Sequence, residues 1–282
     1  MKIAVTAANG NLGAAIVKEL KTQIGAENVI AIARTPKKAE FLGVEVRKGD
    51  YDSYTDFESA LKGVDKILVV SGMDTPKKRI QQHRNIIKAA EANSLNKIVY
   101  TSIVGNTTNT AFDPIINSNR QTERDIEASK LNWAIGRNGL YIEPDLEYIE
   151  QYKTKGCIWN SAGDGKCAYT SREELANAYV QMLLNDSIKY NVYNLAATPI
   201  TQQELANEIN KTYSTKLTYK QLSSEEYLEE RKAELGNFIG TVVSGIYDGI
   251  NNGSFNVASD YEKVMNRKHK LVSELIKDFK NK

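Results

Sequence analysis

The first thirteen residues constrain the fold most strongly, because they join an apolar run to a helical pattern through a turn of small residues. Residues 2–6 are typical of a buried strand, and residues 12–22 have the apolar spacing of an amphipathic helix. The turn between them has the spacing Ala7-x-x-Gly10-x-x-Gly13. Such a turn directs free backbone N–H groups and the positive end of a helix at an anion. The N-terminus therefore predicts a turn that binds the pyrophosphate of a dinucleotide.

Strand and helix patterns alternate at short intervals through the first half of the chain. The predicted strands cover residues 2–6, 29–33, 44–48, 66–70, 97–102 and 132–137, and the predicted helices cover residues 12–22, 54–61, 78–93 and 118–129. Several strand runs are continuously apolar, which is typical of a parallel sheet with helices on both faces. Repeated βα units of this type predict an α/β fold with a doubly wound parallel sheet and right-handed crossovers.

The second half of the chain has shorter and more mixed patterns. Its predicted strands cover residues 157–160, 168–170, 192–195 and 218–221. The first two flank an Asp-Gly turn at residues 162–166, and this arrangement predicts a hairpin-like connection. Three capping boxes are predicted at helix starts, at Ser171, Thr201 and Ser223. The stretch from 223 to 279 is mostly helical in pattern.

These patterns divide the chain into two parts. We predict a dinucleotide-binding domain at residues 1–140 and a smaller mixed α/β substrate-binding lobe at residues 141–282, with segments that can interchange between the lobes. The cleft between the two parts is the expected place for a substrate.

Composition limits the classes of partner. The 37 Lys and Arg residues nearly balance the 35 Asp and Glu residues, so we expect neither a nucleic acid nor a membrane as partner. Short basic patches, at residues 77–79 and 267–270, are interpreted as solvated faces. No signal peptide and no apolar run near the roughly 20 residues of a membrane span are recognised, and a cytoplasmic protein is expected. Cys157 and Cys167 are too few for a disulfide framework, and no metal site is predicted.

The end of the second predicted strand indicates which dinucleotide is bound. Arg34 follows this strand, 21 positions beyond Gly13, and no carboxylate occurs in the adjacent loop before Glu40. An acidic residue at this place selects NAD, whereas an arginine accommodates the 2′-phosphate of NADP. The planar guanidinium suits a phosphate because its donors meet two oxygens at once. The sequence therefore favours NADP(H), with a solvated arginine at a strand end as the alternative.

Taken together, these residues resemble the atypical short-chain dehydrogenases of the NmrA-like type, which have a Rossmann-like fold. Within that family the chain looks most like the flavin-free NAD(P)H:quinone oxidoreductases of type 2 and the triphenylmethane reductases. The stretches that carry the resemblance are the opening turn, Ala31-Ile32-Ala33-Arg34, Gly49-Asp50-Tyr51, Gln82-His83-Arg84-Asn85, Tyr100-Thr101-Ser102, residues 137–141, residues 162–166 with Arg172, and residues 246–250. The resemblance implies NADPH binding in the large lobe and reduction of an electron-poor organic acceptor in the cleft.

The resemblance also assigns roles to particular residues. The implied cofactor-binding residues are Thr6, Ala8, Asn9, Gly10, Asn11, Leu12, Gly13, Arg34, Asp50, Val70, Ser71 and Thr101. The implied catalytic residues, which would approach the nicotinamide and the acceptor, are Ser102, Asn119, Asn138 and Tyr141. The departure from the family is Ala7, where glycine is usual. Alanine is small enough for the turn if its φ stays negative, so weaker but intact binding is expected.

The general acid of the wider superfamily, a Tyr-x-x-x-Lys pair, is missing. Asn119 and Glu123 stand in its place, and only Ser102 remains of the usual set. An alcohol dehydrogenase or a sugar-nucleotide epimerase needs a strong proton donor or acceptor at the reacting carbon, so both are disfavoured. A quinone or a dye cation is already electrophilic and needs mainly orientation in a dry site.

Two functions therefore stay open. The favoured one is an NADPH-dependent reductase, monomeric or homodimeric, of quinones or related aromatic acceptors. The other is a redox sensor that binds NADP(H) without turnover. The isolated His83 is interpreted as a packing or surface residue rather than a catalytic base.

Overall fold

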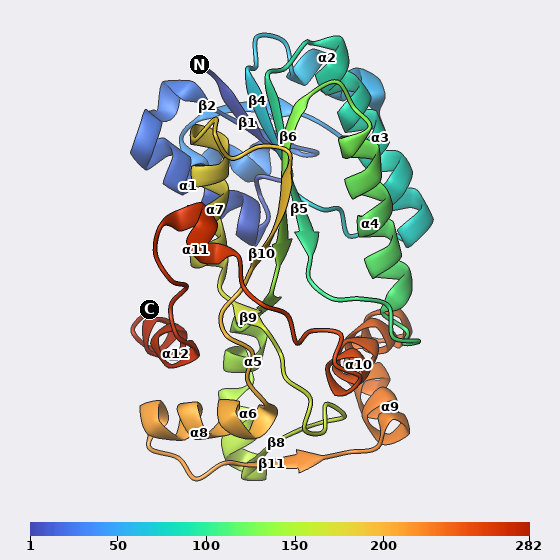
Figure 1. The fold of residues 1–282 in the computed structure, drawn as a ribbon, viewed down its shortest axis with the longest axis vertical. Coiled ribbons are helices and arrows are strands. Elements are labelled where there is room, and N and C mark those ends of the chain that lie inside the picture. The colour runs from blue at the N-terminus through green and yellow to red at the C-terminus, as the bar shows by residue number, and fades with distance from the viewer.

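A seven-stranded sheet forms the centre of the computed structural model, which describes residues 1–282 (Figure 1). Its neighbouring strands all run parallel, in the order β10-β6-β5-β4-β1-β2-β3. The strands are β1 (Ile3–Val5), β2 (Val29–Ala33), β3 (Glu45–Lys48), β4 (Lys66–Val69), β5 (Lys97–Ile103), β6 (Asn132–Asn138) and β10 (Asn191–Leu195). The doubly wound sheet is thus confirmed, and each of the six strands predicted in the first half is present.

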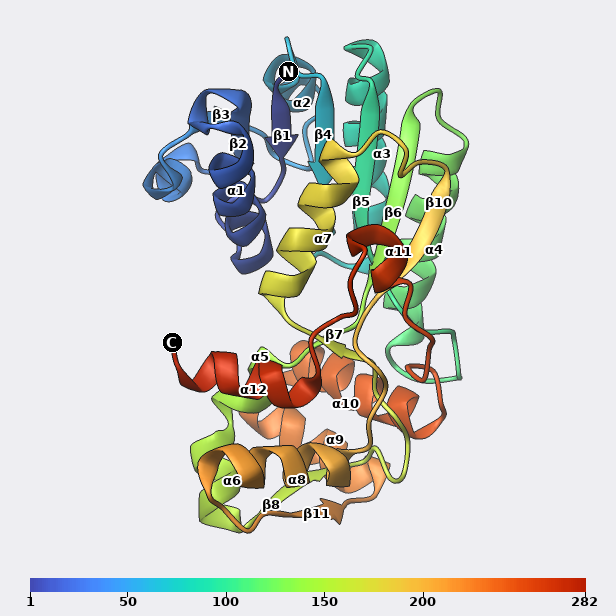
Figure 2. The same ribbon diagram turned by 60° about the vertical axis from the view of Figure 1, so that its left-hand side comes forward.

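Helices cover both faces of the sheet (Figure 2). One face carries α1 (Asn11–Ile24) and α7 (Arg172–Leu184), and the other carries α2 (Tyr54–Ala60), α3 (Pro76–Ala92) and α4 (Asp113–Glu127). The pleat of β1 distributes its side chains accordingly, because Ile3 and Val5 join the core under α1 while Ala4 joins the opposite core. Burial on both faces explains why the strands read as continuous apolar runs.

The strand order reverses beside β1. The chain passes from β1 through β2 to β3 in one direction and then returns to β4 on the other side of β1. At such a switch point the loops leaving the two neighbouring strands diverge, and the crevice outside the carboxyl ends binds ligands in open α/β sheets.

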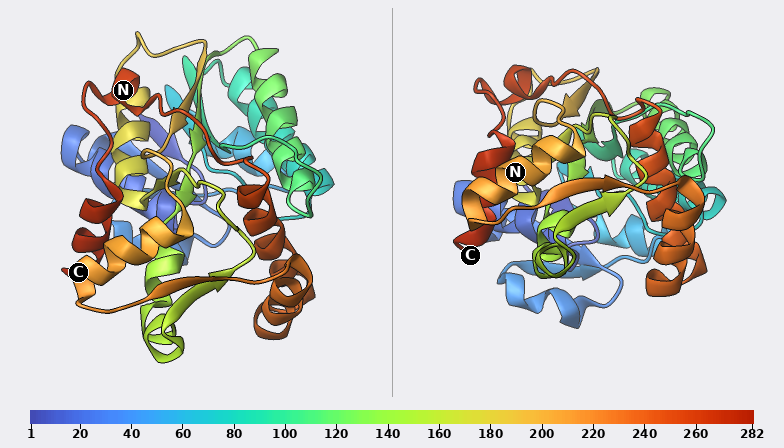
Figure 3. Two further views of the ribbon diagram at one scale, coloured as in Figure 1. Left: turned by 60° about the horizontal axis from the view of Figure 1, so that its bottom comes forward. Right: turned by 90° about the horizontal axis from the view of Figure 1, so that it is seen from below.

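A smaller lobe lies below the sheet, as Figure 3 shows from beneath. Its elements are α5 (Glu143–Glu147), α6 (Ile149–Lys155), β8 (Cys157–Asn160), α8 (Gln202–Tyr213), β11 (Thr218–Gln221), α9 (Ser224–Leu235), α10 (Asn237–Asn251) and α12 (Val272–Lys280). A separate core of buried apolar residues holds it together. Between the two parts lies a two-stranded parallel sheet of β7 (Leu140–Tyr141) and β9 (Tyr169–Thr170).

The chain crosses between the two parts more than once. Helix α7 packs against α1, strand β10 pairs with β6, and α11 (Tyr261–Met265) packs against α7 and β10, so all three lie with the large sheet. The intervening segments belong to the lower lobe.

The predicted hairpin between residues 157 and 170 is wrong. Strand β8 pairs in parallel with β11, and β9 pairs in parallel with β7, so the two strands never pair with each other. The tight turn itself is present, since the Gly165 N–H donates to the Ala162 carbonyl oxygen at 3.0 Å. The prediction of a tight turn is therefore correct, but β8 and β9 pair with segments that are distant from this turn in the sequence.

Two of the three predicted capping boxes are complete, those opened by Thr201 and Ser223. At the third, Ser171 accepts a hydrogen bond from the Glu174 N–H, but no reciprocal bond forms. The Glu174 carboxylate instead pairs with Arg267, a residue far away in sequence.

Candidate functional site

Two adjoining cavities lie outside the carboxyl ends of the strands, on either side of the switch point. The first measures about 540 Å³ and is lined mainly by polar residues of the loops after β1, β2, β3 and β4. The second measures about 380 Å³ and is largely apolar. Residues Ser71–Asp74, which follow β4, line both cavities. The cavities therefore form one groove that changes from polar to apolar along its length.

The turn after β1 forms one wall of the polar cavity, through Ala7, Asn9 and Gly10. The Gly10 N–H donates to the Ala7 carbonyl oxygen at 2.9 Å, which closes the turn. Ala7 has a φ of 48°, so the condition that its φ stays negative is not met. The closed turn requires a left-handed residue there, which is why glycine suits the position better than alanine.

Gly13 allows the helix to approach the turn closely. A Cβ at this residue would lie 2.4 Å from the Ala7 carbonyl oxygen and 3.0 Å from the Ala8 Cα. Helix α1 has no side-chain cap, and the amide groups of Asn11, Leu12 and Gly13 have no hydrogen-bond partner within the chain. Uncapped amides at a helix N-terminus, next to a cavity, suit an anion.

Thr6 and Ala8, both predicted to bind the cofactor, are buried and tie the turn to its neighbours. The Ala8 N–H donates to the Ile32 carbonyl oxygen at 3.1 Å. The Thr6 hydroxyl accepts from the Val70 N–H at 2.9 Å and bonds the Tyr51 hydroxyl at 2.6 Å. Tyr51 in turn donates to the Val70 carbonyl oxygen, so a residue outside the predicted set links the three loops.

Two cations without partners line the far part of the polar cavity. Arg34 and Lys38 both follow β2, both are exposed, and neither side chain forms a hydrogen bond or an ion pair within the chain. Asp50, from the loop after β3, lines the same cavity and accepts a hydrogen bond from the Asp52 N–H. A cavity with two free cations and uncapped helix amides has room and charge for a phosphorylated ligand.

The apolar cavity brings together all four predicted catalytic residues. Ser102, Asn119, Asn138 and Tyr141 line it, and so do Val70, Ser71 and Thr101. Helix α10 supplies the opposite wall. Its contribution consists of Phe238, Ile239, Val242, Val243 and Ile246.

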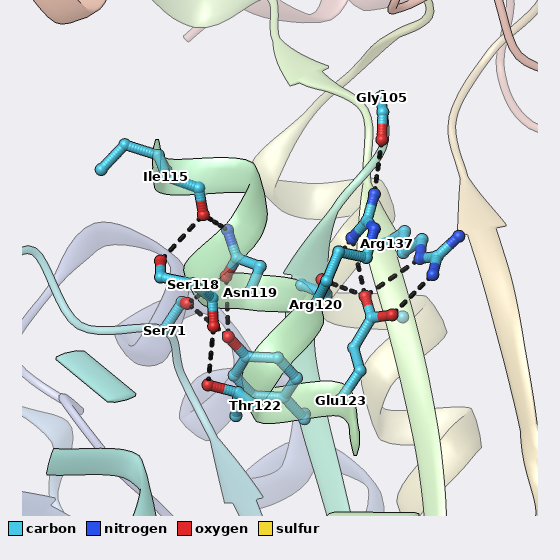
Figure 4. A network of polar contacts seen from close by, with 12 residues as sticks. Ser71, Gly105, Ile115, Ser118, Asn119, Arg120, Thr122, Glu123 and Arg137 are labelled. Atoms are coloured by element: carbon cyan, nitrogen blue, oxygen red, sulfur yellow. Dashed lines mark hydrogen bonds and ion pairs between the residues drawn. The ribbon is translucent and has the colours of Figure 1, made fainter. Parts of the chain in front are cut away.

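Asn119 is held by a network of polar contacts, drawn in Figure 4. Its Oδ1 accepts hydrogen bonds from the Tyr100 hydroxyl at 2.7 Å, the Ser71 hydroxyl at 2.9 Å and the Arg79 guanidinium at 3.0 Å. Its Nδ2 donates to the Ile115 carbonyl oxygen at 3.1 Å. Because its amide oxygen accepts three hydrogen bonds, the Asn119 side chain is held in one orientation at the end of the cavity.

Ser102 is similarly engaged. Its hydroxyl donates to the Glu123 carboxylate and accepts from Arg120 at 3.2 Å. Glu123 forms ion pairs with Arg120 at 2.7 Å and with Arg137 (Figure 4). Burial alone would raise the pKa of Glu123, but the hydrogen bond from Arg137 and the charge of Arg120 hold this pKa below its usual value. Glu123, which stands in the place of the usual Lys, therefore belongs to a structural ion cluster with Arg120 and Arg137.

Tyr141 differs from the other three because its hydroxyl hydrogen is not committed. The Tyr141 oxygen accepts from the Asn138 Nδ2 at 3.3 Å, and its O–H has no acceptor within the chain. The Asn138 Oδ1 accepts from the Tyr179 hydroxyl, which fixes the orientation of the Asn138 amide. Burial raises the pKa of Tyr141, so it stays a neutral phenol that can donate a hydrogen bond.

His83 is a packing residue, as predicted. Its Nε2 accepts from the Gly72 N–H at 3.0 Å, so the Nδ1 carries the hydrogen and donates it to the Thr122 hydroxyl. Burial, and then the charge of Arg79, lower the pKa of His83 to about 3. The neutral ring anchors the loop after β4 to α4.

Sequence reasoning missed two parts of this site. The α10 wall comes from residues 238–246, far from the predicted nucleotide-binding half, although its apolar spacing is visible in the sequence. Arg79 was assigned to a solvated basic patch, and this interpretation is wrong, because only 4% of its surface is exposed. The neighbouring Lys77 and Lys78 are exposed as expected.

The structure contains no helix long and apolar enough to cross a membrane, and no group of three or more His, Cys, Asp or Glu side chains is placed to hold a metal ion.

The chain is similar to known proteins over most of its length. A family model described as NAD(P)H-binding matches residues 7–186. Quinone oxidoreductase 2 of Escherichia coli is 32% identical over 235 residues, which are 82% of this chain and 81% of that protein.

Two solved structures are similar over nearly the whole chain. An NADPH-dependent quinone oxidoreductase of Escherichia coli in complex with NADPH has a TM-score of 0.90 at 28% identity, over 99% of this chain and 100% of that one. The Citrobacter sp. triphenylmethane reductase in complex with NADP(H) has a TM-score of 0.90 at 29% identity, over 99% of both chains.

Proposed function

Because the chain belongs to the NAD(P)H-binding family and is an NAD(P)H-dependent oxidoreductase, we propose that it transfers hydride from NADPH, without flavin, to a quinone or a similar electron-poor conjugated acceptor. The observation that carries this proposal is the groove at the switch point. Its polar end has free cations and uncapped amides, and its apolar end has the Tyr141 hydroxyl, whose hydrogen has no acceptor within the chain. A dinucleotide and a flat apolar acceptor would meet where the two cavities join, at Ser71–Asp74.

The residues of the polar cavity fit the parts of NADPH. Asn9 and Gly10, with the free amides of Asn11, Leu12 and Gly13, would hold the pyrophosphate. Arg34 and Lys38 would pair with the 2′-phosphate, since no carboxylate competes for them, and Asp50 would lie beside the adenosine. The proposed contacts on the nicotinamide side are Val70, Ser71 and Thr101.

When bound, NADPH supplies the hydride, so the chain's own residues have to orient the acceptor and exclude water. The walls from α10 and from Leu140 form the dry part of the cavity. Tyr141 would donate a hydrogen bond to an acceptor oxygen, where negative charge develops. The hydroxyl of Ser102 and the amide oxygen of Asn119 already have partners, so these two residues would shape the site rather than give a proton.

The test is NADPH oxidation by the purified, flavin-free protein with a panel of quinones and a triphenylmethane dye. Turnover that needs no added flavin is expected. Measurable NADPH binding without turnover on any acceptor would contradict the proposal and would favour the NADP(H) sensor. In parallel, Arg34→Ala should weaken NADPH binding at least tenfold while leaving NADH binding nearly unchanged, because only NADPH carries the 2′-phosphate. Equal losses for both cofactors would count against the proposed 2′-phosphate contact.

A further inference from the structure

The guanidinium of Arg79 is buried beside the apolar cavity without a carboxylate partner. Arg79 lines this cavity from α3 and is 4% exposed. Its Nη1 donates to the Ser118 hydroxyl at 3.0 Å, and its Nη2 donates to the Ser71 hydroxyl at 2.8 Å and to the Asn119 Oδ1 at 3.0 Å. Its Nε has no hydrogen-bond partner at all. Every hydrogen-bond acceptor of the guanidinium is therefore neutral, and no ion pair compensates its charge.

A second cluster behind the same cavity is also short of negative charge. Glu123 is the one carboxylate that pairs with both Arg120 and Arg137. Arg120 donates further to the Gly105 carbonyl oxygen at 2.6 Å, which is again a neutral acceptor (Figure 4). Together with Arg79, three guanidiniums face one carboxylate behind Ser102 and Asn119.

The remaining charged residue that lines the apolar cavity does not correct this imbalance. Asp74 is shared with the polar cavity and forms an ion pair with Lys78 at 2.8 Å. The other lining residues are uncharged, and more than half of them are apolar. In such surroundings an uncompensated charge is screened weakly, so a ligand in the cavity experiences a positive potential.

We propose that this excess positive charge, with Arg79 as its main source, selects the charge of the acceptor: neutral or anionic acceptors are favoured, and cationic ones are rejected. The inference rests on the proposed reductase function and narrows its substrate class from two candidates to one. A neutral quinone fits the cavity electrostatically, whereas a triphenylmethane cation is opposed by it.

Hydride transfer changes the charge of the two acceptors in the same direction, so the selection acts on their binding. Accepting a hydride converts a neutral quinone into a hydroquinone monoanion, and a proton from water then completes the hydroquinone. Accepting a hydride converts a triphenylmethane cation into a neutral product, with no proton required. In both reactions the hydrogen and two electrons come from NADPH, leaving NADP⁺. In both reactions the acceptor gains one unit of negative charge, so a positive potential favours hydride transfer to either acceptor once it is bound. The discrimination therefore arises when the acceptor binds, a step that the positive potential opposes for the cation.

The experiment uses three naphthoquinones with the same ring and the same short alkyl chain, which ends in a hydroxyl, a sulfonate or a trimethylammonium group. The saturated chain keeps the ring equally reducible, so the charge is the only variable. Binding is measured to the protein loaded with NADP⁺, which cannot donate hydride, and kcat/KM is measured with NADPH. We expect the wild-type protein to bind the trimethylammonium compound about tenfold more weakly than the sulfonate.

Substitutions of Arg79 and Arg84, both on α3, test whether Arg79 causes the difference in binding between the charged compounds. Arg79→Met should remove the discrimination, and Arg79→Lys should restore most of it. The control Arg84→Met removes an exposed guanidinium of α3 that pairs with Asp125, so it should leave the binding ratio unchanged. Thermal unfolding of each variant establishes that it is folded. If Arg79→Met does not fold, the wild-type series and Arg79→Lys still decide the matter.

Equal wild-type affinities for the sulfonate and trimethylammonium compounds would overturn the inference, and so would an unchanged ratio in folded Arg79→Met. Failure of the proposed function would give a different result from failure of charge selection. In that case no quinone is reduced although NADPH binds, while the binding ratio with NADP⁺ still reports on charge selection.

Discussion

At the scale of single residues, Ala7 holds the turn after β1 in a conformation that suits glycine. Its φ of 48° costs an L residue about 1–2 kcal/mol. Glycine removes this cost but gains about 0.4–1 kcal/mol of freedom in the unfolded chain. We therefore expect Ala7→Gly to raise the free energy of unfolding by about 0.5–1 kcal/mol, as measured by denaturant titration.

The matched control at the other end of the turn is Gly13→Ala. Its new Cβ would lie 2.4 Å from the Ala7 carbonyl oxygen, so this substitution should destabilise the protein. If Ala7→Gly also destabilises the protein, Ala7 does not adopt the left-handed conformation in solution.

The hydroxyl of Tyr141 gives a second prediction at this scale. Tyr141→Phe removes a hydroxyl donor that has no acceptor within the chain and should lower kcat with quinones about tenfold, the effect of roughly one hydrogen bond. The affinity for NADPH should not change. Tyr148→Phe is the control, because its hydroxyl donates to Glu234 and it lines a different cavity. Equal losses in the two variants would argue against a role for the Tyr141 hydroxyl.

The sequence predicts residues whose position follows from the local chain. Gly13 lies where the helix meets the turn, and Arg34 lies where β2 ends, so spacing along the chain was sufficient to find both. Arg79 was misplaced because its burial depends on Ser118 and Asn119, which α4 brings to it from 39 and 40 residues away. Lys77 and Arg79 look alike in a local pattern, and only the packing of α3 against α4 separates them.

At the scale of elements, helix α10 forms a wall of the apolar cavity and packs closely against the segment before α4 at Gly245. A Cβ on Gly245 would lie 2.6 Å from the Phe112 nitrogen and 2.9 Å from the Ala111 carbonyl carbon. Gly245→Val should push α10 away from the start of α4 and raise the KM for quinones severalfold, while NADPH affinity stays the same.

Thr241→Val is the control for that prediction. It introduces a β-branched residue into the same helix, at a side chain that bonds only the Asn237 carbonyl oxygen of its own helix. The interpretation of α10 as an acceptor wall fails if Gly245→Val alters NADPH affinity and quinone KM equally.

Elements with strong local signals were predicted well, and their pairing was not. Strands β1, β2, β4 and β5 are buried almost throughout, so their apolar runs are distinct in the sequence. Strands β8 and β11 are far apart in sequence, and a local pattern could not show that they pair. Helix α4 begins at Asp113, five residues before its prediction, because the Asp113 carboxylate accepts hydrogen bonds from Thr108 and Asn109 and organises the preceding loop.

At the scale of the whole molecule, Arg267 ties the C-terminal segment to α7. It donates to both carboxylate oxygens of the fully buried Glu174 at 2.8 Å. Arg267→Met leaves this carboxylate without its main partner, and we expect a loss of about 2 kcal/mol in the free energy of unfolding at pH 7.

The pH dependence provides a check on that loss. Burial would raise the pKa of Glu174, but the Arg267 hydrogen bonds hold it below its usual value. The unfolded-state pKa of Glu174 is the same in wild type and Arg267→Met, so their difference in stability depends on the pKa of Glu174 in the two folded proteins, which the substitution raises. The difference should therefore be full above the pKa of Glu174 in the folded variant and shrink as the pH falls from there toward the lower wild-type value. A difference that is constant with pH would exclude the ion pair as its source.

The return of α7, β10 and α11 to the large sheet has a consequence for the protein during its synthesis. While the ribosome has released only the first 140 residues, β6 is an open edge and the α1 face of the sheet lacks its covering helix. The β6 edge and the α1 face of the sheet stay uncovered until residues 172–195 emerge, and α11 follows only near residue 265. The nascent chain thus presents an unpaired strand from the completion of β6 at Asn138 until β10 is complete at Leu195. Cells that translate it rapidly, or lack a chaperone to shield that edge, should accumulate more aggregated product than folded enzyme.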